Sequence, residues 1–423
     1  MIPSDVRQRL IDIASTQLHT GDARHQYSPL TKKAMGECGY SDDHLWLILA
    51  VSQYIKETGD VKFLKEIIPY DNHRDGQKGT MYQHLTKALD FTWTHLGPHK
   101  IPNMFNADWN DCLNLYGKQK NSESVFVGIM FVYTAKLMAE IAELINKKDD
   151  KKKFHAMAEK MTKQLNKVAW DGEWFVRAFT ERKEVIGSKQ NKEGQIYLLP
   201  QAWAVIADIA AKERLTKAMN SLNKKLATKH GVMLLTPPYS KYNHEIGSIT
   251  LYPQGLKENG AIFCHPNPWA MIAESILGRG ELAFQYYKSI LPSAKNKISE
   301  IRKTEPYVYC QMIAGKNHKE FGEGKNSWLT GTAAWNFFAI SSYILGIRAG
   351  YKGLIVDPAI PKSWKRFKVI RSYREVSYYI DITNPKGVSK GIKHLMVDGK
   401  KIHGNTIPEQ KNKKICFVEA VMG

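Results

Sequence analysis

The residues 106–114 read Asn106-Ala107-Asp108-Trp109-Asn110-Asp111-Cys112-Leu113-Asn114. This stretch places two carboxylates and three carboxamides around a single tryptophan. An indole face beside acids and amides is what a sugar site requires, because the ring packs on the apolar face of a sugar and the polar groups bind its hydroxyls. A turn that caps a helix would use the same residue types, since Asn and Asp favour caps and turns. The stretch alone leaves both interpretations open.

The composition is that of a globular protein with a large core. The chain has 423 residues, 43% of them hydrophobic and 24% charged, and no apolar run of membrane-spanning length is evident. The N-terminal residues lack the apolar region of a signal peptide, so we expect a cytoplasmic protein. Five scattered cysteines without a C-x-x-C pair argue against a disulfide framework and against a zinc site.

The formal net charge of +20 suggests either an anionic partner or a lysine-rich solvated surface. The lysines occur in short dispersed groups, and no basic stripe interleaved with aromatic residues is present. We therefore expect a solvated surface and no nucleic-acid or membrane partner.

Apolar residues at helical spacing dominate the first 350 residues, and short β-branched runs follow. This predicts a mainly α fold with a helical domain over 1–350 and a small β domain over 351–423. Neither a repeat of solenoid length nor a glycine-rich nucleotide loop is present, so a closed ring of helical hairpins remains. Helices are expected at 4–18, 45–54, 61–68, 80–96, 122–146, 150–169, 199–210, 212–228, 267–277, 280–290 and 328–347.

Four polar and aromatic loop clusters lie between these helices, at 106–114, 252–265, 305–311 and 328–332. Residues in these clusters have ordinary alternatives: Lys257-Glu258 suits a solvated pair, His265 suits a core histidine with a satisfied ring, and Thr330-Gly331 suits a cap or turn. Outside the clusters, Asp42-Asp43 suits the cap of a helix. Taken together, the clusters offer a carbohydrate-binding face, and His, Thr and Gly groups are suitable phosphate donors.

Several of these segments resemble glycoside hydrolase family 94, which includes cellobiose phosphorylase. The segments are Asp108 to Asn114, Gly255 to Gly260 with His265 to Trp269, Thr304 to Gln311, and Lys325 to Trp335. The resemblance runs from about residue 2 to about residue 385, and within the family it is closer to cellobiose phosphorylase than to the chitobiose enzyme.

The resemblance implies an (α/α)6 barrel lacking its first helix, followed by a C-terminal β-sandwich. The implied reaction is inverting phosphorolysis of a β-1,4-linked glucose disaccharide, in which cellobiose and phosphate give α-glucose 1-phosphate and glucose. Phosphate is a co-substrate, and no cofactor or metal is implied. By the same resemblance, Asp111 is the general acid. Residues implied to bind phosphate are His265, Thr330 and Gly331; those implied to bind sugar are Trp109 and Gln311 at the transferred unit, and Tyr252, Lys257 and Glu258 at the leaving unit.

The sequence departs from the family in ways that keep other functions open. Family members carry an N-terminal β-sandwich, a linker and a first barrel helix before the region matched here, and a segment that supplies an Arg and an Asp to the sugar subsite. Arg24 stands where relatives have an aromatic residue, and the loop at 117–122 is short. Three alternatives therefore remain. The chain is an inactive or sugar-binding remnant, or it is an enzyme completed by an N-terminal partner polypeptide or a homodimer. The third alternative is an inverting hydrolase that uses Glu258 or Glu305. Longer cellodextrins and laminaribiose are alternative substrates. A barrel without its first helix also predicts uncovered apolar side chains near 4–18 and 328–347.

Overall fold

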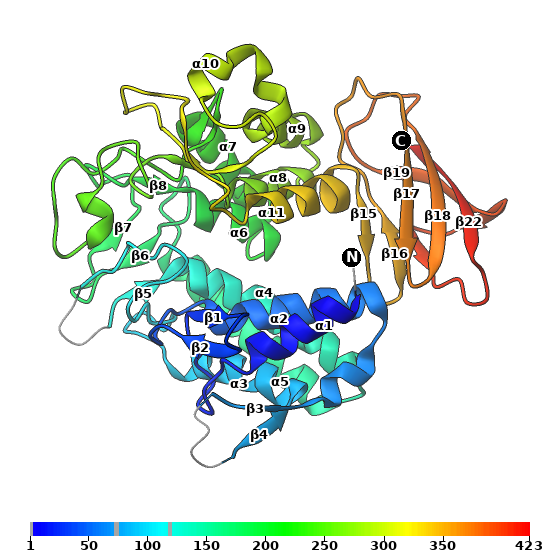
Figure 1. Ribbon diagram of the computed structural model, residues 1–423, viewed down its shortest axis with the longest axis horizontal. Coiled ribbons are helices and arrows are strands. Elements are labelled where there is room, and N and C mark those ends of the chain that lie inside the picture. Colours follow the sequence, from blue (N-terminus) through cyan, green and yellow to red (C-terminus); the bar gives the residue numbers. More distant parts are fainter. Residues whose placement is uncertain (1–2, 72–75, 117–120) are drawn as a thin grey trace. The chain divides into compact units, whose positions relative to one another are not determined.

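The computed structural model describes residues 3–71, 76–116 and 121–423 (Figure 1). The short loop predicted at 117–122 falls mostly outside these ranges. The chain divides into two compact units, which are described separately. Unit 1 comprises residues 1–55, 60–218 and 236–253, and unit 2 comprises 56–59, 219–235 and 254–423.

Most predicted helices are present, with ends within a few residues of those expected. The helices of the first part of the chain are α1 (Pro3–Ala14), α2 (Asp43–Thr58), α3 (Met81–Thr94), α4 (Val125–Leu144), α5 (Lys148–Val168), α6 (Leu198–Ile206) and α7 (Lys212–Leu226). Those that follow are α8 (Asn267–Ile276), α9 (Gly280–Ile290), α10 (Ser299–Arg302) and α11 (Thr332–Phe338). Short 3-10 helices are η1 (Val61–Lys65), η3 (Ser248–Leu251) and η4 (Pro292–Ile298), and a π-helical turn, η5 (Ala339–Ile344), continues α11.

Two expected helices differ from the structure. The segment predicted at 61–68 forms only η1, followed by strand β3 (Ile67–Pro69). The helix predicted from 328 begins at Thr332, because the backbone at Asn326 and Trp328 has positive φ angles of 53° and 71°, which a right-handed helix excludes.

The centre of unit 1 is the antiparallel-packed pair α4 and α5. Nearly every side chain of α4 is buried, whereas α5 buries Phe154, Met157, Met161 and Leu165 on one face, at the spacing of an amphipathic helix. By length and hydropathy α4 resembles a membrane span, but 83% of its apolar window is buried inside the protein, as in the core helices of globular domains.

Short strands occupy the connections between these helices, and the sequence analysis missed them. The pairs are β1 (Gln26–Ser28) with β2 (Lys33–Met35), β3 with β4 (Lys78–Thr80), and β5 (Glu123–Ser124) with β6 (Ala178–Phe179) and β7 (Val185–Ile186). Further short strands are β8 (Ile196–Tyr197), β9 (Ala227–Thr228), β10 (Gly231–Val232) and β11 (Leu235–Thr236).

In unit 2, three strands from the loop clusters form a small sheet in the order β12 (Ile262–Phe263), β13 (Cys310–Ile313) and β14 (Gly324–Ser327). The C-terminal residues form two further sheets, of three and five strands, as the β-branched runs predict. One contains β15 (Ile347–Ala349), β16 (Gly353–Val356) and β21 (Thr406–Pro408). The other has the order β17 (Arg366–Tyr373), β18 (Val376–Thr383), β22 (Ile415–Met422), β19 (Ile392–Val397) and β20 (Lys400–Ile402), with β18 and β22 parallel.

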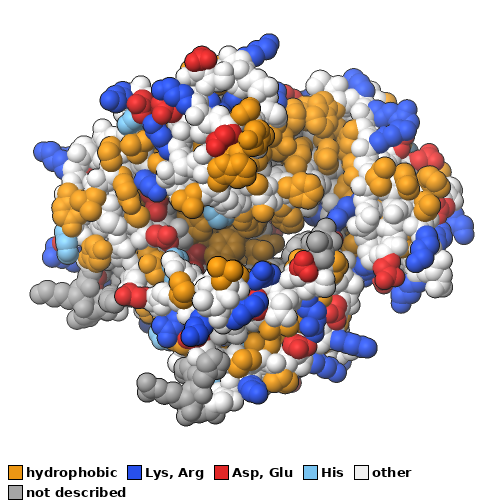
Figure 2. Space-filling model, viewed as in Figure 1, with side chains coloured by type: hydrophobic (Ala, Val, Ile, Leu, Met, Phe, Trp, Pro, Cys, Tyr) orange, Lys and Arg blue, Asp and Glu red, His pale blue; other side chains and the backbone are white. Residues whose placement is uncertain are grey.

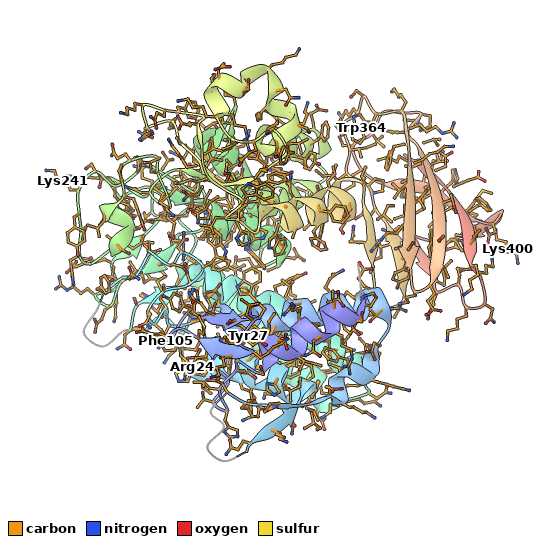
Figure 3. All side chains as sticks on the ribbon, in the orientation of Figure 1. Arg24, Tyr27, Phe105, Lys241, Trp364 and Lys400 are labelled. Carbon is orange, nitrogen blue, oxygen red and sulfur yellow. The ribbon has the colours of Figure 1, made fainter. Side chains whose placement is uncertain are left out.

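The two C-terminal sheets share one hydrophobic core. Leu354 and Ile407 from the first sheet join Tyr378, Ile380 and Val418 from the second in a single buried cluster. Alternating burial along β17 and β22 shows why the strands form, since inward residues pack and outward residues are solvated. Trp364, labelled in Figure 3, packs against the rim of this core.

Charged side chains are dispersed over the surface. Figure 2 shows the Lys and Arg side chains of the visible face as separate groups mixed with Asp and Glu. Apolar side chains are also exposed in the two regions where the sequence predicts uncovered apolar surface, 4–18 and 328–347. Ile13 on α1 is 45% exposed, and Leu329 and Phe337 are 66% and 73% exposed.

The loop at 106–115 is fixed to the rest of unit 1 by a fully buried ion pair between Asp108 and Arg177. Arg177 Nη2 donates to Asp108 Oδ1 over 2.5 Å and to Asn110 Oδ1 over 2.9 Å. Ser124 Oγ donates to Asp108 Oδ2 over 2.6 Å. Ser124 Oγ also accepts a hydrogen bond from the backbone N–H of Val127, which makes Ser124 the N-cap of α4. The first carboxylate of the loop therefore attaches it to the start of the central helix.

We predict that Arg177→Met lowers the free energy of unfolding by about 3–5 kcal/mol, because it leaves the Asp108 carboxylate buried without a cation. Urea unfolding measures the loss. Adding Asp108→Asn to Arg177→Met should restore part of it, since the uncompensated charge is then removed. Arg366→Met is the control: it breaks the solvent-exposed pair with Asp381 and should cost about 1 kcal/mol or less. A loss of similar size in both single variants would contradict the structural role of the pair.

Gly247 packs closely against Asn114, near the C-terminal end of the 106–115 loop. Gly247 has a φ of 105°, and a Cβ built on it would lie 2.7 Å from the backbone N of Asn114. We predict that Gly247→Ala costs more stability than Gly399→Ala, which has a positive φ of 75° but open space around its Cβ. Both variants carry backbone strain of about 1–3 kcal/mol, and only Gly247→Ala adds a clash with the loop. Equal unfolding midpoints would show that the contact with Asn114 does not constrain the loop.

Candidate functional site

Asp111 is the exposed carboxylate of the loop that Asp108 fixes. Its side chain keeps 57% of its surface exposed, whereas the side chains of Asp108 and Arg177 are fully buried. The Asp111 backbone carbonyl accepts a hydrogen bond of 3.0 Å from Asn114 Nδ2, so this contact within the loop does not use the Asp111 carboxyl. The two acids of one motif thus have different environments.

The pKa of Asp111 is raised, because the protein atoms around its partly exposed carboxyl displace some of the water that would stabilise the carboxylate. His25 opposes this shift, and the negative charges of Asp43 and Asp108 add to it. A raised pKa keeps a proton on the group closer to neutral pH, which is the property a general acid needs.

A second segment, 243–252, is hydrogen-bonded to the acid loop. Ser248 Oγ donates to Asn114 Oδ1 over 2.8 Å, the backbone N–H of Ile249 donates to the carbonyl of Cys112 over 2.7 Å, and Cys112 Sγ lies 3.6 Å from Tyr252 Oη. The structure therefore places Tyr252 against the loop that carries Asp111, although 140 residues separate Tyr252 from Cys112. Trp109 is half-buried in the same loop.

The remaining predicted site residues belong to unit 2. Lys257 Nζ donates to Gln311 Oε1 over 2.8 Å, and Asn326 Nδ2 donates to the same oxygen over 2.9 Å. Glu258 is buried, and its backbone carbonyl accepts from the N–H of Gly260. Lys257 and Gln311 thus form one polar group across the loop clusters at 252–265 and 305–311.

The three residues predicted to bind phosphate also lie together. A Cβ added to Gly331 would lie 3.3 Å from Cε1 of His265, so the glycine allows the imidazole to approach the backbone. Thr330 is the residue before Gly331, and its Oγ1 accepts the N–H of Thr332 over 3.1 Å. Burial lowers the pKa of His265 to about 4, so its imidazole is neutral near pH 7.

The sequence analysis did not identify His25 and Asp43 as site residues. Asp43 is the first residue of α2, as the cap prediction required, but its Oδ2 also lies 2.9 Å from His25 Nδ1. His25 Nε2 lies 3.9 Å from Asp111 Oδ1. A histidine in the polar connection before Pro29 was the available signal, and only the fold shows which acids it meets.

Arg177 was missed as well. The signal for it was an arginine inside the apolar run Trp174 to Phe179, a setting in which a charged residue usually has a buried partner.

A cavity of about 270 Å³ adjoins this cluster in unit 1. Its lining includes Arg24, His25, Tyr27, Asp43 and Trp46. Figure 3 labels Arg24, which lies just before strand β1, and Tyr27, which lies within that strand. Arg24 donates to Asp71 over 2.9 Å, so the residue that departs from the family pattern is held at the cavity wall by an ion pair.

Solved structures and curated sequences match this chain. A sialidase structure matches with a TM-score of 0.60 at 11% identity, covering 88% of this chain and 33% of the sialidase. The GH78 rhamnosidase of Bacillus sp. GL1 matches with a TM-score of 0.52 at 14% identity, covering 82% of this chain and 34% of the rhamnosidase. At these identities the likeness concerns the fold alone.

Among curated sequences, an N,N'-diacetylchitobiose phosphorylase of Vibrio proteolyticus is 40% identical over 385 residues, covering 90% of this chain and 47% of the relative. Solabiose phosphorylase of Paenibacillus borealis is 33% identical, covering 96% of this chain and 52% of the relative. The chain thus spans about half the length of these relatives. The 40% match is with a diacetylchitobiose enzyme, so these matches do not support the expected closeness to cellobiose phosphorylase.

The family model of the glycosyl hydrolase 94 superfamily, catalytic domain, matches residues 1–346. This range contains all the predicted site residues. The chain belongs to the glycosyl hydrolase 94 superfamily.

Proposed function

We propose that this chain carries the general acid and the phosphate-binding residues of an inverting phosphorylase for β-linked disaccharides. The observation that carries the proposal is the difference between the two carboxylates of the Asp108–Asn114 loop. Asp108 is committed to Arg177 inside the protein, and Asp111 remains exposed with a raised pKa. The chain also belongs to a family in which the two relatives named above are phosphorylases, and this supports the same reaction class.

In this reaction Asp111 gives its proton to the glycosidic oxygen as the bond from that oxygen to the anomeric carbon breaks. A phosphate oxygen forms the new bond to the same carbon from the opposite face, giving an α-sugar 1-phosphate. An inverting hydrolase needs a second carboxylate to activate water. Phosphate is already an anionic nucleophile, so a phosphorylase needs one acid and a site that holds the anion.

His265, Thr330 and Gly331 are the proposed phosphate-binding residues. Their proximity in unit 2 supports this assignment. A neutral His265 binds phosphate through its ring N–H, together with the Thr330 hydroxyl and backbone N–H groups. A bound dianion would itself raise the pKa of His265, so binding and protonation of the imidazole would reinforce each other.

The sugar-binding residues follow the same assignment. Trp109 and Gln311 border the transferred sugar, and Tyr252, Lys257 and Glu258 hold the leaving sugar. The contact between Cys112 and Tyr252 and the hydrogen bond between Lys257 and Gln311 support the grouping within each unit. At the level of architecture we propose an (α/α)6 barrel lacking its first helix over 1–350 and a β-sandwich over 351–423.

The substrate is proposed from two sources that differ. The relative of 40% identity makes N,N'-diacetylchitobiose the first disaccharide to test, and the sequence motifs make cellobiose the second. Because the chain spans about half of its relatives, we also propose that activity requires the part of their length that this chain does not match. The exposed Ile13 in unit 1 and the exposed Phe337 in unit 2 each offer apolar surface for contact with that part.

The first test mixes the chain, alone and co-expressed with the preceding half of the Vibrio proteolyticus relative, with phosphate and each disaccharide. We expect sugar 1-phosphate release from the co-expressed protein, with one of the two disaccharides preferred. Sugar release that does not depend on phosphate would indicate a hydrolase. Sugar binding without either product, in a complex shown to be assembled, would indicate a non-catalytic remnant.

The second test is Asp111→Asn, which keeps the shape of the side chain and removes its proton. We predict that phosphorolysis falls by about 10²–10⁴-fold and that synthesis from a glycosyl fluoride falls as well, because the same residue must accept the proton of the acceptor hydroxyl. Phosphate affinity should survive or increase. Because Asn114 contacts the backbone of Asp111 and not its carboxyl, the free energy of unfolding should remain within about 0.5 kcal/mol of the parent value. Near-parental phosphorolysis would transfer the acid role to Glu258, since Asp108 is committed to Arg177.

A further inference from the structure

His25 connects the cavity in unit 1 to the exposed acid. Its Nδ1 lies 2.9 Å from Asp43 Oδ2, and its Nε2 lies 3.9 Å from Asp111 Oδ1. The ring stacks on Tyr40 with centroids 3.8 Å apart and planes 17° apart. The His25 backbone N–H is bonded to the Glu37 carbonyl, so both the backbone and the ring are fixed.

The partner of Nδ1 determines which nitrogen faces Asp111. A carboxylate accepts hydrogen bonds, so Asp43 holds the proton on Nδ1 and leaves Nε2 directed at Asp111. The hydrogen bond to Asp43 raises the pKa of His25, which favours an imidazolium that can donate from Nε2 as well. The ring also lines the cavity of about 270 Å³, which is large enough for several water molecules and therefore allows proton exchange.

We propose that His25, oriented by Asp43, is a positioning residue that stabilises the carboxylate form of Asp111 and so lets this acid release and recover its proton at the same pH. The proposal rests on the proposed role of Asp111. In phosphorolysis the proton leaves Asp111 for the glycosidic oxygen, and in synthesis it returns from the acceptor hydroxyl. A group that must act in both directions works best when neither of its forms is strongly favoured.

The charges around Asp111 show why a cation is needed there. Burial, the Asp43 carboxylate and the Asp108 carboxylate all favour the protonated form. The charge of Asp108 is already countered by Arg177, and that of Asp43 is shared with His25. Among the groups of the described structure that act on Asp111, His25 is the one that favours its carboxylate form.

The test measures this coupling without requiring activity. Asp carboxyl carbons are labelled with ¹³C, the Asp111 signal is assigned by its loss in Asp111→Asn, and its midpoint is followed by NMR. We expect His25→Phe, which keeps a ring on Tyr40 and removes both nitrogens, to raise the Asp111 midpoint by about one pH unit. Asp43→Asn should give a smaller shift, because it removes the carboxylate that favours protonated Asp111 together with the hydrogen bond that favours the His25 imidazolium.

Two further measurements separate coupling from a general disturbance of the fold. Coupling is reciprocal, so Asp111→Asn should lower the His25 midpoint by a similar amount, and this readout holds even if His25→Phe does not fold. His244→Phe is the matched control, because His244 stacks on Tyr116 in the same unit without a contact to Asp111. It should leave the Asp111 midpoint unchanged.

In the co-expressed enzyme, His25→Phe should move the alkaline limb of the phosphorolysis profile to higher pH and reduce synthesis at pH 7 more than phosphorolysis. An unmoved Asp111 midpoint in His25→Phe, with an unmoved His25 midpoint in Asp111→Asn, would overturn the proposal. If the coupling is measured and no phosphorolysis is found, the proposed function fails while the pairing of His25 with Asp111 stands.

Discussion

The buried pair of Asp108 and Arg177 is the interaction on which the site depends. Removing both charges from water costs several kcal/mol for each, and the structure offsets this with hydrogen bonds from Ser124 and to Asn110. Because Ser124 is also the N-cap of α4, the pair joins the functional loop to the central helix of unit 1. The position of Asp111 follows, since it lies three residues further along a loop whose first carboxylate is fixed inside the protein.

The helices were predictable because their burial is periodic along the chain. The spacing of Phe154, Met157, Met161 and Leu165 defines α5 from the sequence alone. The two-residue strands between helices were not predictable, because pairs such as β5 and β6 form from distant segments and carry no periodicity of their own. The start of α11 was placed too early because the left-handed backbone at Trp328 leaves no pattern in the hydrophobic residues.

The segments of the candidate site were predictable from the sequence, and the family resemblance proposed a role for their residues. The motif by itself does not distinguish the environments of Asp108 and Asp111. Arg177, 69 positions from Asp108 in sequence, makes the difference, because it forms the buried ion pair with Asp108. His25 and Asp43 were likewise visible only as a polar connection and a helix cap, because their pairing requires the segment 26–42, with strands β1 and β2, to return the chain to His25 at the start of α2.

The commitments of these side chains also bear on the choice between water and phosphate as the nucleophile. A hydrolase acting by inversion needs a free carboxylate base in addition to its acid. Within the described part of unit 1, the carboxylates that act on Asp111 are Asp43 and Asp108, and each already has a cationic or imidazole partner. Neither is arranged to activate water. Within unit 1, these partners favour the proposed nucleophile that brings its own negative charge over water, which needs a carboxylate base.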